Sequence, residues 1–107
     1  MPVYNKLVRD RIPEVIAHTG KKAVWETLTD EQYLSCAKEK MKEELGEYLA
    51  SKNDDEAVEE LADLLELIYC LAEQHNSTVD QLEVVRREKA EKRGSFKEKV
   101  FLREVIE

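Results

Sequence analysis

The chain has 107 residues, of which 38% are charged and 42% are hydrophobic, and its formal net charge is −7. This length predicts one domain, and the hydrophobic fraction is too high for a disordered chain. An acidic chain of this kind is a poor general binder of nucleic acid, because the phosphate backbone repels it, so we expect no nucleic-acid polymer as a partner.

Cysteine usage and hydropathy bear on the cellular compartment. Cys36 and Cys70 lack the spacing of a metal site, so we expect reduced thiols in a cytoplasmic protein. The N-terminus is too polar for a signal peptide, and the longest apolar stretch, from Leu64 to Ala72, is too short to span a bilayer. We therefore expect no membrane association.

The first 28 residues predict an extended lead and a short helix. Asp10 can cap this helix, Pro13 is tolerated in its first turn, where amides lack partners, and Gly20 ends it. Residues 21–28 are ambiguous between a loop and a short extended segment.

A longer helix is predicted to begin after Thr29. Thr29 and Gln32 have the spacing of a capping box, in which each side chain accepts a hydrogen bond from the other residue's backbone amide. The helix ends at residues 51–53. Apolar residues recur at every third or fourth position and define one buried stripe, namely Leu34, Ala37, Met41, Leu45 and Tyr48.

Two further helices follow. Asn53 and Glu56 offer another capping box, which opens a helix to about His75. The second half of this helix, LLELIYCLA, is apolar on most of its circumference, as in a helix that a bundle and a partner subunit bury on several sides. The last helix begins at Ser77 or Thr78.

These elements predict an all-α fold with a single domain over residues 1–107. The expected architecture is an antiparallel bundle of about four helices that oligomerisation completes. A chain of this length can hardly cover its third helix alone, so we expect a homodimer or a homotetramer. The last helix ends at Gly94, which suits a C-cap, and the structure of the tail that follows it is left open.

Acidic residues are paired on the two central helices. Glu44 and Glu47, and likewise Glu60 and Asp63, stand three positions apart and therefore on one helical face. The short connection makes the two helices antiparallel neighbours, so the two pairs can face each other. Glu43 falls almost opposite the buried stripe, so of these five acidic residues it is the least favoured to join a shared site.

Carboxylates brought together in this way repel one another, and a hard divalent cation relieves the repulsion. All-oxygen ligands suit Mg²⁺ or Mn²⁺, and Mg²⁺ commonly shares substrate phosphates. The alternative is two solvated acidic faces, which arise often by chance in a chain with 24 acidic residues. Both interpretations stay open on the acidic residues alone.

Basic residues concentrate near the C-terminus. Residues 86–99 contain seven basic and three acidic residues, which favours a small anionic ligand over a polymer in an otherwise acidic chain. Arg86, Lys89 and Arg93 continue the apolar face of the last helix and can grip phosphates whose other oxygens bind the metal. The alternative is a solvated basic end that suits the helix dipole.

The acidic motifs resemble a known family. KEKMKEELGEYL, followed by EELADLLELI, resembles the EExxE, spacer, ExxD signature of the MazG-like all-α nucleoside triphosphate pyrophosphatases. The start, VYNKLVRDRIPEVI, and the later REKAEKRGSFKEKVFL are similar to a predicted housecleaning branch related to phosphoribosyl-ATP pyrophosphohydrolase. The likeness covers nearly the whole chain, with Ser95 where relatives commonly have a second glycine.

The resemblance implies a helical bundle completed by dimerisation or higher assembly. It also implies Mg²⁺-dependent cleavage of a nucleoside triphosphate between the α and β phosphates, to a monophosphate and pyrophosphate. The implied catalytic residues and metal ligands are Glu44, Glu47, Glu60 and Asp63, with Glu43 in the first acidic place of the signature. The implied phosphate ligands are Lys89, Arg93 and Lys97 near the C-terminus, with Asn5, Lys6 and Arg9 matching the N-terminal motif.

Two other functions fit parts of the sequence. A catalytically silent helical module would bind a nucleotide or a protein partner. A purely structural bundle would fit the composition but not the terminal motifs. The acids are intact in both acidic motifs, which favours the enzyme over the silent module. The motifs leave open the base and the sugar of the substrate, and whether it is a normal or a damaged nucleotide.

Overall fold

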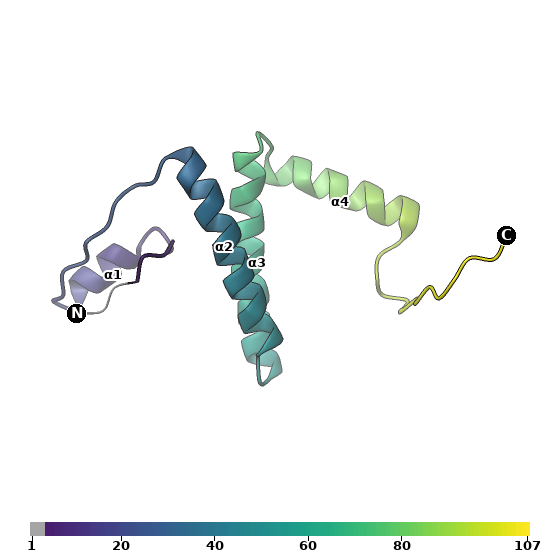
Figure 1. The fold of residues 1–107 in the computed structure, drawn as a ribbon, viewed down its shortest axis with the longest axis horizontal. Coiled ribbons are helices and arrows are strands. Elements are labelled where there is room, and N and C mark those ends of the chain that lie inside the picture. The colour runs from purple at the N-terminus through teal and green to yellow at the C-terminus, as the bar shows by residue number, and fades with distance from the viewer. Residues whose placement is uncertain (1–3) are drawn as a thin grey trace.

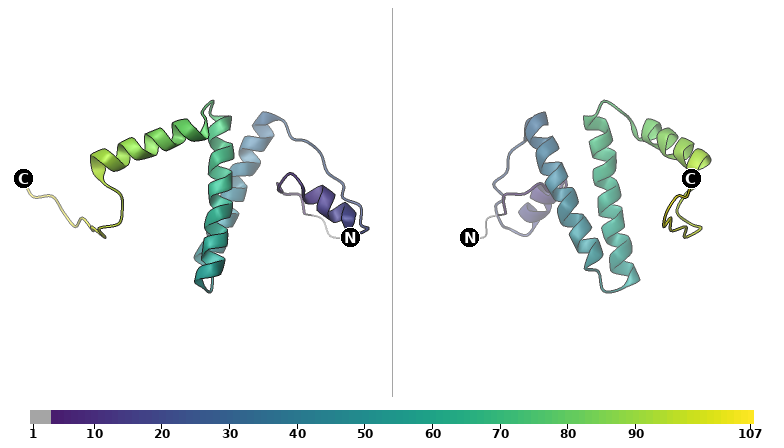
Figure 2. Two further views of the ribbon diagram at one scale, coloured as in Figure 1. Left: turned by 180° about the vertical axis from the view of Figure 1, so that it is seen from behind. Right: turned by 45° about the vertical axis from the view of Figure 1, so that its right-hand side comes forward.

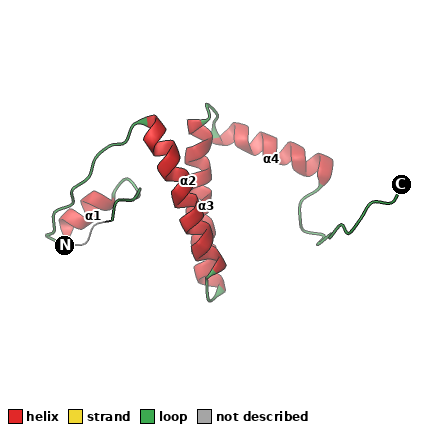
Figure 3. Cartoon of the chain, viewed as in Figure 1, coloured by secondary structure: helices red, strands yellow, loops and turns green. Residues whose placement is uncertain are grey.

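A computed structural model describes residues 4–107 of the chain as four helices, and no strand occurs among these residues. The helices are α1 (Ile12–His18), α2 (Asp30–Leu49), α3 (Asp54–Gln74) and α4 (Val79–Arg93). Figure 3 shows the loops that join them and the irregular tail that follows α4. The prediction of an all-α fold with four helices is confirmed.

Side-chain caps define where α2 and α3 begin. Thr29 Oγ1 accepts a hydrogen bond from the Gln32 amide at 3.2 Å, and Gln32 Oε1 accepts one from the Thr29 amide at 3.1 Å, so the predicted capping box is confirmed. Asn53 Oδ1 accepts from the Glu56 amide at 2.9 Å, as predicted. The Glu56 carboxylate, however, accepts from the amide of Lys52 at 3.0 Å, so the second box is closed one residue early.

The short helix α1 begins differently from the prediction. Its N-cap is Arg11 and no side chain caps it, so the expected role of Asp10 is wrong. The chain enters α1 through a turn in which the Ile12 amide donates to the Arg9 carbonyl at 3.0 Å, and Pro13 has no amide hydrogen, so neither residue offers Asp10 a free donor. Pro13 lies in the first turn as expected. Residues 21–28, which the sequence left ambiguous, have no regular structure.

Helices α2 and α3 form an antiparallel hairpin, and they lie side by side in the views of Figures 1 and 2. The buried core is small, and among residues 4–107 Ala37 on α2 is the one hydrophobic residue that is fully buried. The predicted stripe of α2 faces this interface only in part, because Leu45 is 47% exposed. Helix α3 of one chain therefore covers only part of the apolar stripe of α2.

Helix α4 projects away from the hairpin, so one chain does not close a four-helix bundle (Figure 1). The radius of gyration is 18.3 Å, whereas a compact domain of this length has about 13 Å. The accessible surface is 10164 Å², compared with roughly 6,200 Å² for a folded monomer of this mass. Exposed apolar side chains lie on both α3 and α4, among them Val58, Leu61, Leu65, Val84 and Val85.

Within residues 4–107, no helix combines the length and the apolar content that crossing a bilayer requires.

Candidate metal centre

The acidic residues of the two motifs gather between α2 and α3. Their carboxylates form two groups that share Glu44, one with Glu43 and Glu47 on α2 and the other with Glu60 and Asp63 on α3. In each group, one carboxylate oxygen from every residue lies within 4.8 Å of the others. We call these five residues the acidic cluster. Glu43, the least favoured of the five, lies at its edge with 41% of its side chain exposed.

Glu44 is the buried centre of the acidic cluster. Only 6% of this residue is exposed, because α2 packs against α3 at this point. Within residues 4–107, Oε2 of Glu44 and Oε2 of Glu60 are both shielded from solvent and receive no hydrogen bond. A carboxylate oxygen that is removed from water without a hydrogen-bond donor destabilises its surroundings. A bound cation would compensate both atoms at once.

Glu60 already responds to the crowding of charge. Its pKa is raised from the ordinary 4.5 to about 7, first because a protonated Glu60 can donate a hydrogen bond to Glu44, and then because of burial and the neighbouring carboxylate of Glu47. Near neutral pH a proton therefore competes with any metal for this position. The proton supplies the positive charge that the acidic cluster requires.

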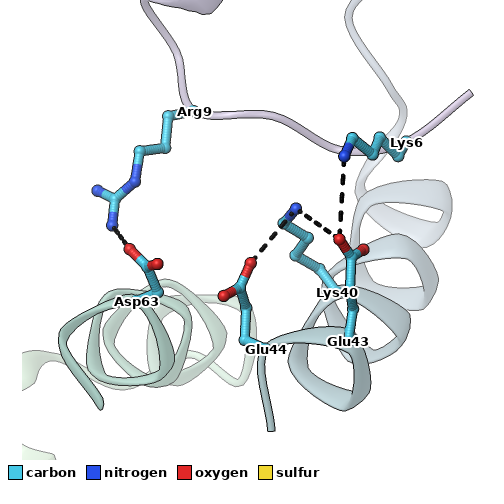
Figure 4. Close-up of polar contacts among 6 residues, drawn as sticks. All are labelled: Lys6, Arg9, Lys40, Glu43, Glu44 and Asp63. Atoms are coloured by element: carbon cyan, nitrogen blue, oxygen red, sulfur yellow. Dashed lines mark hydrogen bonds and ion pairs between the residues drawn. The ribbon is translucent and has the colours of Figure 1, made fainter. Parts of the chain in front are cut away.

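Three basic side chains, Lys6, Arg9 and Lys40, border the acidic cluster (Figure 4). Lys40 Nζ lies 3.5 Å from Glu43 Oε1 and 3.4 Å from Glu44 Oε1, which stand three and four positions further along the same helix. Lys6 Nζ lies 3.9 Å from Glu43 Oε1, and Arg9 Nη2 lies 2.5 Å from Asp63 Oδ1. The pKa of Arg9 is raised, first by its hydrogen bond to Asp63. The N-terminal motif thus lies over the acidic cluster.

The donor set fits a hard divalent cation. Every candidate ligand atom is a carboxylate oxygen, and neither histidine nor cysteine joins the two groups found in the described part of the chain. This favours Mg²⁺ or Mn²⁺ over Zn²⁺. Ligands on opposite sides of a Mg²⁺ ion are about 4.2 Å apart, so groups of oxygens within 4.8 Å of one another can close on an ion by small side-chain rotations.

The C-terminal basic residues lie elsewhere in the single chain. Arg86 pairs with Glu83 on its own helix, and Lys89 and Arg93 follow on α4, which leads away from the hairpin (Figure 1). Arg93 lines a cavity of about 240 Å³ beside the tail, and the Lys97 amide donates to Ser95 Oγ at 3.4 Å. One chain therefore does not bring these predicted phosphate ligands to its own acidic cluster.

Comparisons with known proteins give one partial match. The chain is 43% identical over 54 residues to an uncharacterized protein of Mycolicibacterium smegmatis. The match covers half of this chain and 55% of that relative. No protein-family model matches the chain, and no solved structure matches it significantly.

Lys40 is the site residue that our reading of the sequence missed. It stands three and four positions before Glu43 and Glu44, a spacing that places oppositely charged side chains together on a helix. The abundance of lysine and glutamate on α2 hides this signal, since Lys42 and Glu39 show the same spacing and form an exposed pair at 3.1 Å. Burial of Glu44 is what distinguishes the first pair from the second.

Proposed function

We propose that the chain is a Mg²⁺-dependent nucleoside triphosphate pyrophosphohydrolase that cleaves between the α and β phosphates. The observation that carries the proposal is the pair of solvent-shielded carboxylate oxygens, Glu44 Oε2 and Glu60 Oε2, to which no residue among 4–107 donates. A cluster that binds a cation, with a proton on Glu60 in its absence, explains these atoms, whereas two solvated acidic faces would leave them in water. The acidic motifs resemble the MazG-like enzymes, and both terminal motifs resemble a predicted housecleaning branch related to phosphoribosyl-ATP pyrophosphohydrolase. These resemblances support a nucleotide, including a damaged one, as the substrate.

In this proposal the acidic residues bind the metal and the basic residues contact the phosphates. Glu44, Glu47, Glu60 and Asp63 hold the cation, with Glu43 at the edge of the acidic cluster. A bound Mg²⁺ supplies charge neutralisation and polarisation of the phosphate oxygens. The basic side chains that border the acidic cluster then face a phosphate chain rather than carboxylates. Both cysteines are free thiols, in keeping with a cytoplasmic location.

A second copy of the chain completes the bundle in this proposal, as a homodimer or within a homotetramer. The surface in excess of a compact monomer is roughly 4,000 Å², several times the 800 Å² or so that each partner buries in a standard interface. The exposed apolar residues of α3 and α4, including Leu61, Leu65 and Val85, supply the contact. Such packing also offers a route for Lys89, Arg93 and Lys97 of one copy to reach the acidic cluster of another.

The proposal is tested by pyrophosphate release from a panel of normal and damaged nucleoside triphosphates, with and without Mg²⁺. We expect Mg²⁺-dependent release with at least one member of the panel. Glu47→Gln and Asp63→Asn should each lower kcat by a factor on the order of hundreds, since a catalytic metal contributes several kcal/mol to transition-state stabilisation.

Glu59→Gln is the matched control for these variants. Glu59 is exposed on α3 and belongs to neither carboxylate group, so its loss should change little. Equal losses in the control and the two variants would contradict the assignment of the ligands. A chain that binds Mg²⁺ and nucleotide but releases no pyrophosphate would instead be the silent module.

A further inference from the structure

A cavity of about 530 Å³ lies between α2 and the N-terminal segment, which we define as residues 4–11. Asn5 and Lys6 line it from the N-terminal segment, while Lys40, Lys42 and Glu43 line it from α2. The backbone of Asn5, one of the lining residues, has a positive φ of 45°. The volume is within the range of sites that hold small molecules.

The lining of this cavity favours an anion. Three lysines from two elements of the chain face two carboxylates, those of Glu39 and Glu43. Lys42 is paired with Glu39 on the exposed surface of α2. Lys6 and Lys40 share the other carboxylate, Glu43, and Lys40 also reaches Glu44. The Nζ of Lys40 belongs to a side chain that is only 19% exposed, so it can bind an anion in a partly desolvated place.

Glu43 connects the cavity with the acidic cluster, because it belongs to both. A divalent cation bound by Glu43 and Glu44 would repel the ammonium groups of Lys6 and Lys40, which now occupy the same side of these carboxylates (Figure 4). Released from the carboxylates, both ammonium groups would still be within reach of the cavity, because Lys6 and Lys40 line it. An anion bound by the metal could then also contact these two lysines.

We infer that this cavity binds the phosphate groups of the metal-bound substrate, and that Lys6 and Lys40 hold those phosphates after the cation has taken their place beside Glu43 and Glu44. The inference rests on the proposed function, since it needs a cation in the acidic cluster. It adds Lys40 as a phosphate ligand and assigns a place to Lys6. The ligand is a phosphate or pyrophosphate group whatever the base attached to it.

Isothermal titration calorimetry tests the inference on the full chain, with two titrations for each variant. The first titrates Mg²⁺ alone, and the second titrates inorganic pyrophosphate into protein saturated with Mg²⁺. Lys6→Gln and Lys40→Gln should each weaken pyrophosphate binding roughly tenfold or more, the loss expected for a charged hydrogen bond. The same variants should bind Mg²⁺ alone as tightly as the wild type or more tightly, because a competing cation has been removed.

Lys38→Gln is the control, since Lys38 is exposed on α2 and lies outside the cavity lining. It should leave both affinities unchanged, and Lys40→Arg, which keeps the charge, should retain most of the pyrophosphate affinity. If Lys40→Gln proves unstable by circular dichroism, Lys6→Gln carries the test, because Lys6 lies outside the helices.

The two titrations separate the failure of this inference from that of the proposed function. A wild type that binds Mg²⁺ but holds pyrophosphate no more tightly than Lys6→Gln and Lys40→Gln overturns the inference alone. A loss of Mg²⁺ binding in these variants in parallel with pyrophosphate also overturns it, since a purely structural role predicts that result. A wild type that binds no Mg²⁺ overturns both.

Discussion

Replacing Glu44 with glutamine removes a charge from the centre of the acidic cluster and nearly preserves the size of the side chain. Glu44 belongs to both carboxylate groups and is 6% exposed, so water cannot take over the compensation of its charge. In the metal-free protein the change relieves repulsion from Glu60 and Glu47, although it also ends the ion pair with Lys40. These two effects oppose each other, so the metal-free Tm should change little.

The effect of the substitution appears when Mg²⁺ is added. A ligand that binds only the folded state adds about 2.7 kcal/mol at a hundredfold excess over its Kd. Each kcal/mol shifts the Tm of a domain of about 100 residues by roughly 4–8 °C, so the wild type should gain roughly 10–20 °C. Glu44→Gln should lose most of this gain, because both carboxylate groups lose their shared ligand.

Differential scanning fluorimetry measures this gain at a fixed protein concentration, because the Tm of an oligomer depends on the protein concentration. Glu59→Gln, exposed on α3, is the control and should gain as much as the wild type. If Glu44→Gln gains as much as the wild type and the control, the acidic cluster does not hold the metal through Glu44. If the wild type itself gains nothing, the metal site is refuted.

Three further predictions concern the surroundings of the acidic cluster and the assembly of the chain. Arg9→Gln should raise the affinity for Mg²⁺ about two- to fivefold in calorimetry, because the exposed pair with Asp63 competes with the metal by at most about 1 kcal/mol; a lower affinity would contradict this competition. Because the pKa of Glu60 rises on folding from 4.5 to about 7, the metal-free stability to urea should decrease as the pH rises from about 4.5 through 7. The affinity for Mg²⁺ should increase across the same range, because the proton leaves Glu60. A flat profile of stability against pH would contradict the raised pKa. Sedimentation should show an oligomer at micromolar concentration, and Leu61→Glu should shift it toward a monomer, because Leu61 is exposed on the apolar face of α3. A monomeric wild type would contradict the proposal that a second copy covers this face.

Local features of the structure follow from the sequence because the interacting residues are close along the chain. The capping box of Thr29 and Gln32 joins residues three positions apart, and Glu44 and Glu47, like Glu60 and Asp63, share a face through the helical repeat alone. The same repeat, with the short connection after α2, predicts that the two acidic pairs face each other, and the structure brings them together. Short-range geometry therefore determines the four helices and most of the acidic cluster.

Other features depend on contacts between distant segments, which no local pattern encodes. Arg9 and Asp63 are 54 positions apart, and their ion pair exists only because the N-terminal segment lies over the hairpin. The burial of Glu44, and with it the difference between a solvated acid and an uncompensated one, requires α3 to pack against α2. The direction of α4 is likewise not encoded locally. Within one chain α4 contacts only the end of α3, and its apolar residues stay exposed. The sequence by itself determined which side chains could form a metal centre. The tertiary structure decided which carboxylates are removed from water and which basic side chains lie beside them, because desolvation depends on the packing of whole helices.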